Sequence, residues 1–238
     1  MIWGLVTRRE RWGLSWSGRL IVLVAISLTF YLCLSHVYPF LAITHRVNAS
    51  VLVVEGWIHE YAIRAASDEF QTNHYERIFT TGGPVEGNGG YVNDYQTSAS
   101  VGADLLKKYG LTDESVQMVP SRVMDRDRTY GSAIALRNWF RDHNLSVSGI
   151  DVVTESLHAR RTQLLYQKAF GRDVPVGIIA VPNPDYNSKH WWRYSDGVRE
   201  VLGESIAYIY ARFLFFPAAS KKSQAIAEAP RHPVSMRQ

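Results

Sequence analysis

Short runs of β-branched and apolar residues alternate along this chain with longer segments whose apolar residues recur at helical spacing. Strands that alternate with helices favour a parallel sheet covered on both faces, and continuous apolar runs are typical of strands buried on both sides. The sequence therefore predicts an α/β fold, a Rossmann-like three-layer sandwich with a mostly parallel sheet of about five strands. The expected strands are residues 50–55, 77–81, 116–119, 149–154 and 176–181.

The connections between these runs predict where the helices begin. No pair of runs is separated by a hairpin turn, so no antiparallel pair is expected. Between the second and third runs, Asn93 and Gln96 have the spacing of a capping box, which predicts that a helix begins at this point.

A long apolar segment precedes the α/β pattern. Residues 20–43 contain no Asp, Glu, Lys or Arg, and about 20 such residues are enough to cross a bilayer as a helix. A cleaved signal peptide would need small residues at a processing site, which residues 38–45 do not offer. A buried core helix is rarely apolar all round. We therefore expect one uncleaved N-terminal transmembrane helix at residues 20–43.

The charges around this segment predict its orientation. The positive-inside rule places residues 1–19 in the cytoplasm and the main domain outside. Residues 44–49 are expected to be a short tether with a reach of ~20 Å. The α/β domain is assigned to residues 44–217, and residues 218–238, which show no periodicity, to a disordered tail. The arginines that precede the apolar segment are Arg8, Arg9, Arg11 and Arg19.

Composition and charge limit the classes of partner and of site that the chain can have. The net charge is +4, with clusters of basic residues at both ends of the chain rather than in one block. Because no base-stacking or groove-reading motif accompanies this surplus, we expect no nucleic-acid partner. Cys33 is the only cysteine and lies within the apolar segment, so the α/β domain has no disulfide, cysteine nucleophile or thiolate ligand.

The most informative candidate site follows the fourth strand. His158 and Arg161 lie three residues apart, so on a helix they share a face near the positive end of its dipole. A titratable imidazole beside a fixed cation suits an anionic ligand, with His158 as the candidate acid–base group and Arg161 neutralising charge. The alternative is that both side chains are structural.

Four other loops follow predicted strands, at residues 55–57, 81–83, 121–129 and 182–192, and in parallel sheets such loops form the ligand site where the strand order reverses. Gly82 and Gly83 free backbone N–H groups for an anion, although a turn that requires positive φ explains them equally well. Glu55 and Gly56 end the first strand. No Walker motif or Gly-x-Gly-x-x-Gly motif is present, so the usual nucleotide cofactors are not indicated.

The loop after the third predicted strand, at residues 121–129, carries acidic and basic residues. Asp127 or Thr129 is positioned to cap the helix that follows. With Glu55 and Asp125, Asp127 has the oxygen ligands that a divalent cation needs, but pairing with neighbouring arginines is the favoured interpretation. We therefore expect no metal.

The last predicted helix carries a continuous apolar stripe. Ser195 suits its N-cap. We expect the stripe to pack in the core, with contact to the bilayer surface as the alternative. Its residues are Val198, Val201, Leu202, Ile206, Ile209 and Phe213.

Over residues 50–215 the chain resembles the ElyC/SanA/YdcF family. The resemblance implies a Rossmann-like domain in the periplasm, anchored in the bacterial inner membrane, with a role in envelope or peptidoglycan maintenance that extends to polyprenyl-phosphate carrier metabolism. One soluble relative is associated with S-adenosylmethionine. The chain departs from the family pattern after the first strand, where Glu55-Gly56-Trp57 replaces a glycine-rich turn, and at Tyr130 and Gly131. The matching motifs are Val53-Val54-Glu55-Gly56, Thr80-Thr81-Gly82-Gly83, Arg126-Asp127-Arg128-Thr129, and Val152-Val153-Thr154 with His158 and Arg161.

Three functions remain open from the sequence. The leading hypothesis is a membrane-anchored envelope protein that binds a phosphorylated or otherwise anionic small molecule. The second is a non-enzymatic envelope scaffold or regulator. The third is a nucleotide- or S-adenosylmethionine-binding enzyme, which would require a cytoplasmic domain. Whether the protein is an enzyme, and which cofactor it uses, is not determined by these residues.

Overall fold

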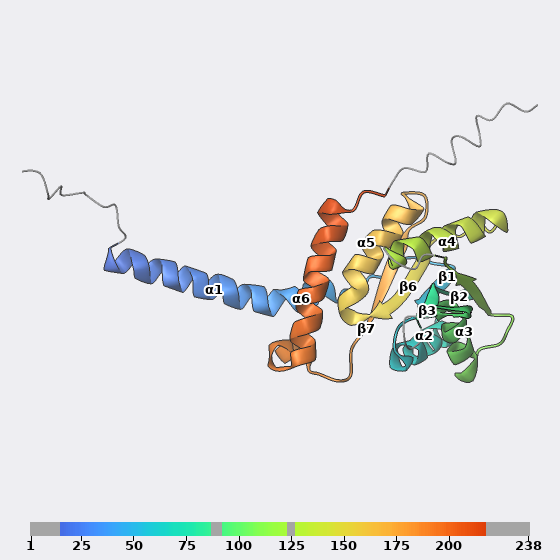
Figure 1. The fold of residues 1–238 in the computed structure, drawn as a ribbon, viewed down its shortest axis with the longest axis horizontal. Helices are drawn as coiled ribbons and strands as arrows, with labels where there is room; N and C mark the ends of the chain where they lie inside the picture. Colours follow the sequence, from blue (N-terminus) through green and yellow to red (C-terminus); the bar gives the residue numbers. More distant parts are fainter. Residues whose placement is uncertain (1–14, 87–91, 123–126, 218–238) are drawn as a thin grey trace, which may run out of the picture.

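A computed structural model of the chain describes residues 15–86, 92–122 and 127–217 (Figure 1). The predicted α/β class is confirmed, since a five-stranded sheet with strand order β5-β2-β1-β6-β7 is parallel throughout. Its strands are β1 (Val51–Glu55), β2 (Arg77–Gly82), β5 (Val116–Pro120), β6 (Ile150–Glu155) and β7 (Val176–Val181). Each observed bound differs from the predicted one by at most one residue.

Helices cover both faces of this sheet, which makes the three-layer sandwich (Figure 1). Alternate residues of β1 explain the layering, because Val51 and Val53 face one hydrophobic core while Leu52 and Val54 face another. The first core lies under α4 (Arg128–Asp142) and α5 (Ala159–Phe170), and the second under α2 (Glu60–Thr72) and α3 (Ser98–Lys108).

A small hairpin-like pair departs from the prediction. β3 (Pro84–Glu86) and β4 (Val92–Thr97) form a separate antiparallel two-stranded sheet, so the expectation of no antiparallel pair is wrong. The predicted capping box at Asn93 is also wrong, since Asn93 lies within β4. The capping box is formed instead by Thr97 and Ser100, whose hydroxyl groups each accept from the other's backbone N–H at 3.1 Å, and α3 begins at Ser98.

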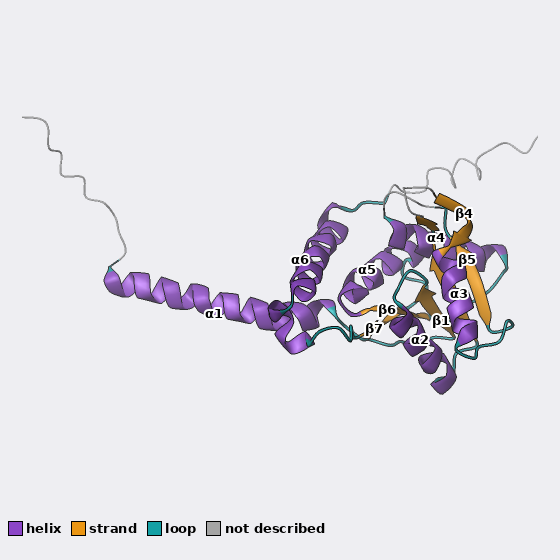
Figure 2. Cartoon of the chain, turned by 60° about the horizontal axis from the view of Figure 1, so that its bottom comes forward, coloured by secondary structure: helices purple, strands orange, loops and turns teal. Residues whose placement is uncertain are grey.

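The N-terminal helix α1 (Trp16–Leu41) is long and apolar enough to cross a membrane. It begins four residues before the start of the predicted segment and ends two residues before the predicted end. Its C-terminal turns pack against the α/β domain, where Tyr38 and Leu41 are buried. The rest of α1 projects away from the domain (Figure 2).

Residues 44–49 are not a free linker, so the predicted tether is wrong. His45 forms an antiparallel bridge with Ile178 of the edge strand β7, with both backbone hydrogen bonds at 2.8 Å. Arg46 makes a bidentate ion pair with Glu69, at 2.7 and 2.8 Å. The edge of β7 therefore forms backbone hydrogen bonds with this segment, and this pairing holds the end of α1 against the domain.

The last helix α6 (Ser195–Ile209) continues into a π-helical turn, η3 (Tyr210–Leu214). The predicted core packing of its apolar stripe is wrong. Val201 is buried, but Leu202, Ile206, Ile209 and Phe213 are 56, 69, 54 and 63% exposed. The opposite face packs inward because it carries Glu204, which pairs with two residues of the domain, and the small Ala211.

The predicted cap of this helix is also displaced by one residue. Tyr194 occupies the N-cap position, and Ser195 is the first helical residue, so no side-chain capping bond forms.

Candidate functional site

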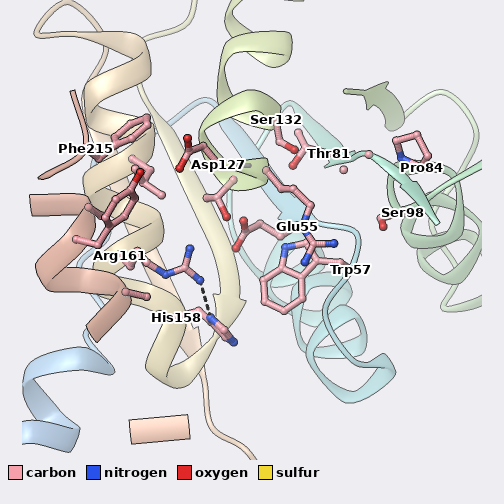
Figure 3. A pocket seen from close by; sticks show the side chains of 18 residues that line it. Glu55, Trp57, Thr81, Pro84, Ser98, Asp127, Ser132, His158, Arg161 and Phe215 are labelled. Atoms are coloured by element: carbon pink, nitrogen blue, oxygen red, sulfur yellow. Dashed lines mark hydrogen bonds between the residues drawn. The ribbon is translucent and has the colours of Figure 1, made fainter. Parts of the chain in front are cut away.

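A cavity of about 310 Å³ lies at the carboxyl edge of the sheet (Figure 3). The strand order reverses between β1 and β6, because the chain leaves β1 toward β2 on one side and β6 toward β7 on the other. This reversal is the position at which open α/β sheets bind ligands. The predicted site residues that line the cavity are Glu55, Gly82, Gly83, Asp127, Thr129, His158 and Arg161.

Gly56 is the one predicted site residue that does not line this cavity. It lines a neighbouring hollow beside Trp57. A Cβ at Gly56 would overlap the carbonyl oxygen of Ser98, so the absence of a side chain lets the start of α3 approach the end of β1. The structure thus gives Gly56 a packing role next to the cavity.

The Gly82-Gly83 turn also allows the start of α3 to lie close to the end of a strand, in this case β2. Gly82 has φ of +150°, in the region that favours glycine. A Cβ there would lie 2.6 Å from the Cβ of Ser98. The carbonyl oxygen of Gly83 accepts from the backbone N–H of Ser98 at 2.8 Å. The interpretation of Gly82 as a turn residue is therefore correct, and the turn also forms one wall of the cavity.

His158 and Arg161 are held together by Glu204, a residue that the sequence did not single out. The Nε of Arg161 donates to Oε2 of Glu204 at 2.8 Å, and Nη2 donates to Oε1 at 3.1 Å. The Nδ1 of His158 lies 2.9 Å from the same Oε1. The 3₁₀ turn η1 (Ser156–His158) and α5 are thereby joined to α6 by one carboxylate.

This contact decides the tautomer of His158. Figure 3 marks a 3.0 Å contact between Arg161 Nη2 and His158 Nδ1, but a nitrogen that donates to Glu204 cannot also accept from Arg161. Donation to a carboxylate is the stronger interaction. We therefore place the Nδ1 proton on the Glu204 side, which leaves Nε2 as the ring nitrogen that does not contact Glu204. Trp57 packs edge-on against this ring, with centroids 4.9 Å apart.

The charges of this cluster shift the pKa values of its members. Burial by itself would raise the pKa of Glu204, but hydrogen bonds from His158 and Arg161 outweigh burial and lower the pKa to about 2. Burial acts to lower the pKa of Arg161, and the Glu204 carboxylate more than offsets it, so the pKa is raised. At neutral pH the pair is therefore ionised.

The lowered pKa of Glu204 predicts an acid-sensitive component of stability. Because the pKa falls from an ordinary 4.5 to about 2 on folding, the carboxylate stabilises the folded state above about pH 4.5, and this contribution is lost as the pH falls towards 2. A shift of this size corresponds to ~3 kcal/mol. Urea unfolding at several pH values checks it: the stability difference between the wild type and Glu204→Gln should shrink by about this amount on acidification. A difference that is constant with pH would contradict the assignment.

Glu55 supplies a second buried carboxylate at the floor of the cavity. Its side chain is 1% exposed, and its Oε2 accepts from the hydroxyl groups of Thr154 at 2.6 Å and Thr162 at 3.1 Å. Its Oε1 has no hydrogen-bond partner among the described residues. A buried oxygen of this kind requires a donor, and a ligand in the cavity is positioned to supply one.

The N-terminus of α4 opens onto the same cavity. Asp127 is the N-cap residue with φ of 54°, and its side chain makes no capping bond, so the predicted capping role of its side chain is wrong. Thr129 is the second residue of the helix rather than its cap. The first backbone N–H groups of the helix therefore have no side-chain cap from Asp127, and they present partial positive charge to the cavity.

Metal ligands do not cluster in the described part of the chain, where no group of three His, Cys, Asp or Glu residues is arranged around one point. Asp125, which the sequence grouped with Asp127 and Glu55, lies outside the described residues. The donors that the described residues do offer are backbone N–H groups, two arginines and one imidazole, which suit an anion better than a cation.

The comparisons with known proteins assign no family: no protein-family model matches the chain, and no curated protein matches it. The functional argument therefore rests on the cavity and its side chains.

Proposed function

We propose that this protein is a membrane-anchored α/β protein that binds a phosphorylated or otherwise anionic small molecule in the cavity at the carboxyl edge of its sheet. One observation carries the proposal. Seven residues chosen for their chemistry, from four separate loops, line a single cavity at the reversal of strand order.

The anion would be bound by backbone and side-chain donors together. The uncapped N-terminus of α4 provides N–H groups, and the Gly82-Gly83 turn admits a ligand close to the main chain. The Nε and Nη2 groups of Arg161 donate to Glu204, and its Nη1 makes no hydrogen bond with the described residues. The Oε1 of Glu55, which has no partner among the described residues, would accept a hydrogen bond from a hydroxyl group of the ligand. The site thus fits an anion that also carries a donor, such as a phosphate monoester.

The same geometry supports proton transfer. A carboxylate that fixes the Nδ1 proton of a histidine leaves Nε2 free as an acid–base group, and Glu204 has this relation to His158. His158 is therefore the candidate catalytic residue, and Glu204 is its positioning residue. The reaction itself is not part of the proposal.

The setting follows from the apolar helix and the sequence. Helix α1 would anchor the protein, and the arginines before it favour a domain outside the cytoplasm. The resemblance to the ElyC/SanA/YdcF family adds a bacterial inner membrane, a periplasmic domain and envelope or peptidoglycan maintenance. Polyprenyl-phosphate carriers are phosphate esters, which agrees with the donors around the cavity.

Thermal unfolding of the full chain in detergent tests the ligand class. Inorganic pyrophosphate and hexyl phosphate should raise the melting temperature, because a ligand at about 100 times its Kd stabilises the folded state by ~3 kcal/mol. Hexylamine should have no effect, and Met118→Gln on the exposed surface of β5 should respond as the wild type does. A shift with the amine, or no shift with either phosphate, would overturn the proposal.

A second function is favoured by one specific observation. The part-buried His158–Arg161–Glu204 cluster connects α5 to α6, which is what the scaffold hypothesis requires of these residues. Under that hypothesis the cluster is a brace, and substitutions in it change stability while no small anion binds.

A further inference from the structure

From Leu202 onward, the outer face of α6 and of the following turn η3 is apolar, whereas the first turns of α6 expose Asp196 and Arg199. Leu202, Ile206, Ile209 and Phe213 are separated by four, three and four residues, so they form one stripe along the helix, and each is more than half exposed. We call these four residues the α6 stripe. Exposed Leu214 and Phe216 extend the apolar surface beyond η3. A contiguous apolar surface of this kind marks an interaction site, whereas single exposed apolar residues do not.

The α6 stripe faces away from the domain. The opposite side of the helix holds Glu204, which pairs with Arg161 of α5, and Ala211, which packs on Leu165 of α5. In Figures 1 and 2, α6 stands at the edge of the domain from which α1 projects, with α5 on its inner side. The stripe therefore faces the side of the molecule on which the exposed part of α1, residues 20–33, lies.

The length of the exposed part of α1 determines how close to the α/β domain the lipid must lie. Residues 20–33 of α1 are uncharged and exposed, and at 1.5 Å per residue they span ~21 Å. The hydrocarbon layer of a bilayer is ~30 Å thick. The remaining ~9 Å is about six more residues, and tilting the helix would increase this number. Lipid must therefore reach the level of residues 34–39.

That level is where the domain packs on α1. Leu34, Val37 and Tyr38 join the hydrophobic cluster formed with η2 (Ser188–Arg193) and α6, and the indole N–H of Trp191 donates to the carbonyl oxygen of Leu34 at 3.1 Å. The ring of Phe40 packs edge-on against Tyr208 of α6. Helix α6 thus crosses α1 at the depth that the bilayer surface must occupy.

From these observations we propose that α6 is an interfacial helix: it lies along the bilayer surface with the α6 stripe among the lipid chains. Both figures show α6 running crosswise to α1 (Figures 1 and 2). A helix crosswise to a membrane-spanning helix lies along the membrane plane, and amphipathic helices insert their apolar face by ~5–10 Å in that orientation.

The residues that border the stripe agree with a lipid partner. Trp192, Tyr194 and Tyr210 are each about two-fifths exposed, and Trp and Tyr are enriched at the membrane interface. Arg199 and Arg212 are exposed beside the stripe, where their guanidinium groups can reach lipid phosphates. A second copy of the chain is the competing occupant, but it would not supply the lipid that the short free part of α1 requires.

The inference rests on the proposed anchor but not on the proposed ligand. It has one consequence for the cavity, whose wall includes Ala207 and Ala211 on the inner side of α6 and η3. The cavity then lies about one helix diameter, ~10 Å, from the lipid.

Depth-dependent fluorescence quenching in the full chain tests the inference. Single cysteines are introduced by Ile206→Cys or Ile209→Cys in a Cys33→Ala background, labelled with a bimane dye, and reconstituted in nanodiscs of phosphatidylcholine and phosphatidylglycerol. Spin-labelled lipid should quench both labels several-fold more than a label introduced by Met118→Cys. Met118 is the matched control because it is an equally exposed apolar residue on β5, at the far edge of the sheet.

The native Cys33 of the wild type, labelled with the same dye, separates failure of the anchor from failure of the inference. Quenching at Cys33 without quenching at the stripe would overturn the interfacial helix and leave the anchor intact. No quenching at Cys33 would overturn the anchor and the inference with it. Stripe labels that resist both lipid quencher and aqueous iodide, and that cross-link between chains, would show that a second copy covers the stripe and would also overturn the inference.

Discussion

Glu204→Gln is expected to lower the free energy of unfolding by ~3–5 kcal/mol, because it leaves the largely buried guanidinium group of Arg161, whose side chain is 19% exposed, without its counter-charge. Glu204 accepts two hydrogen bonds from Arg161, and the oxygen Oε1 also contacts His158, so the substitution disrupts the contacts of both residues. Urea unfolding of the full chain in detergent at neutral pH measures the effect. The matched control is Glu60→Gln, which breaks the exposed ion pair with Lys108 and should leave the unfolding midpoint unchanged.

Replacing the Arg161–Glu204 ion pair with apolar residues separates the two proposed roles of the cluster. Arg161→Met combined with Glu204→Leu removes both charges, and such replacements of buried pairs are often neutral or stabilising. We expect this double variant to recover most of the stability that Glu204→Gln loses. If the cavity binds an anion through Arg161, the double variant should no longer respond to pyrophosphate. A folded double variant that still binds would contradict the assigned role of Arg161, and a double variant as unstable as Glu204→Gln would contradict the energetic argument.

Gly56→Ala is expected to destabilise the protein by ~1–3 kcal/mol or more, because the new methyl group meets backbone atoms that cannot rotate away. The Cβ would overlap the carbonyl group of Ser98, at the start of α3. The strand end and the helix must then separate, and the adjacent Gly82 turn must move with them. Thermal or urea unfolding measures the loss.

Gly203→Ala provides the matched control for this substitution. Gly203 lies within α6, and a Cβ there meets nothing within 4 Å. Because alanine favours the helix over glycine, this variant should be more stable by ~0.5–1 kcal/mol. Equal effects of the two substitutions would show that the contact with Ser98 does not limit the space at Gly56.

Local sequence was sufficient for the fold class because local patterns encode strands and helices. The apolar runs of β1 and β6 are buried on both faces, and a strand of that kind requires helices above and below it. The same reasoning selected loops at one edge of the sheet, so the convergence of Gly82, Asp127 and His158 on one cavity follows from the parallel topology. It failed at Asn93, where a short strand pair replaces the expected helix start.

The pairing of distant residues was decided only by the tertiary structure. Glu204 lies more than 40 residues from Arg161, and nothing near it in the sequence marks it as a partner. It sits on the polar side of α6, which a local pattern assigns to solvent. The ion pair with Arg161 turns that polar side inward, and the apolar side of the same helix is left facing outward. The sequence alone thus determined that α6 is amphipathic, and the tertiary structure decided which side it buries, because one buried carboxylate on that side accepts hydrogen bonds from both His158 and Arg161.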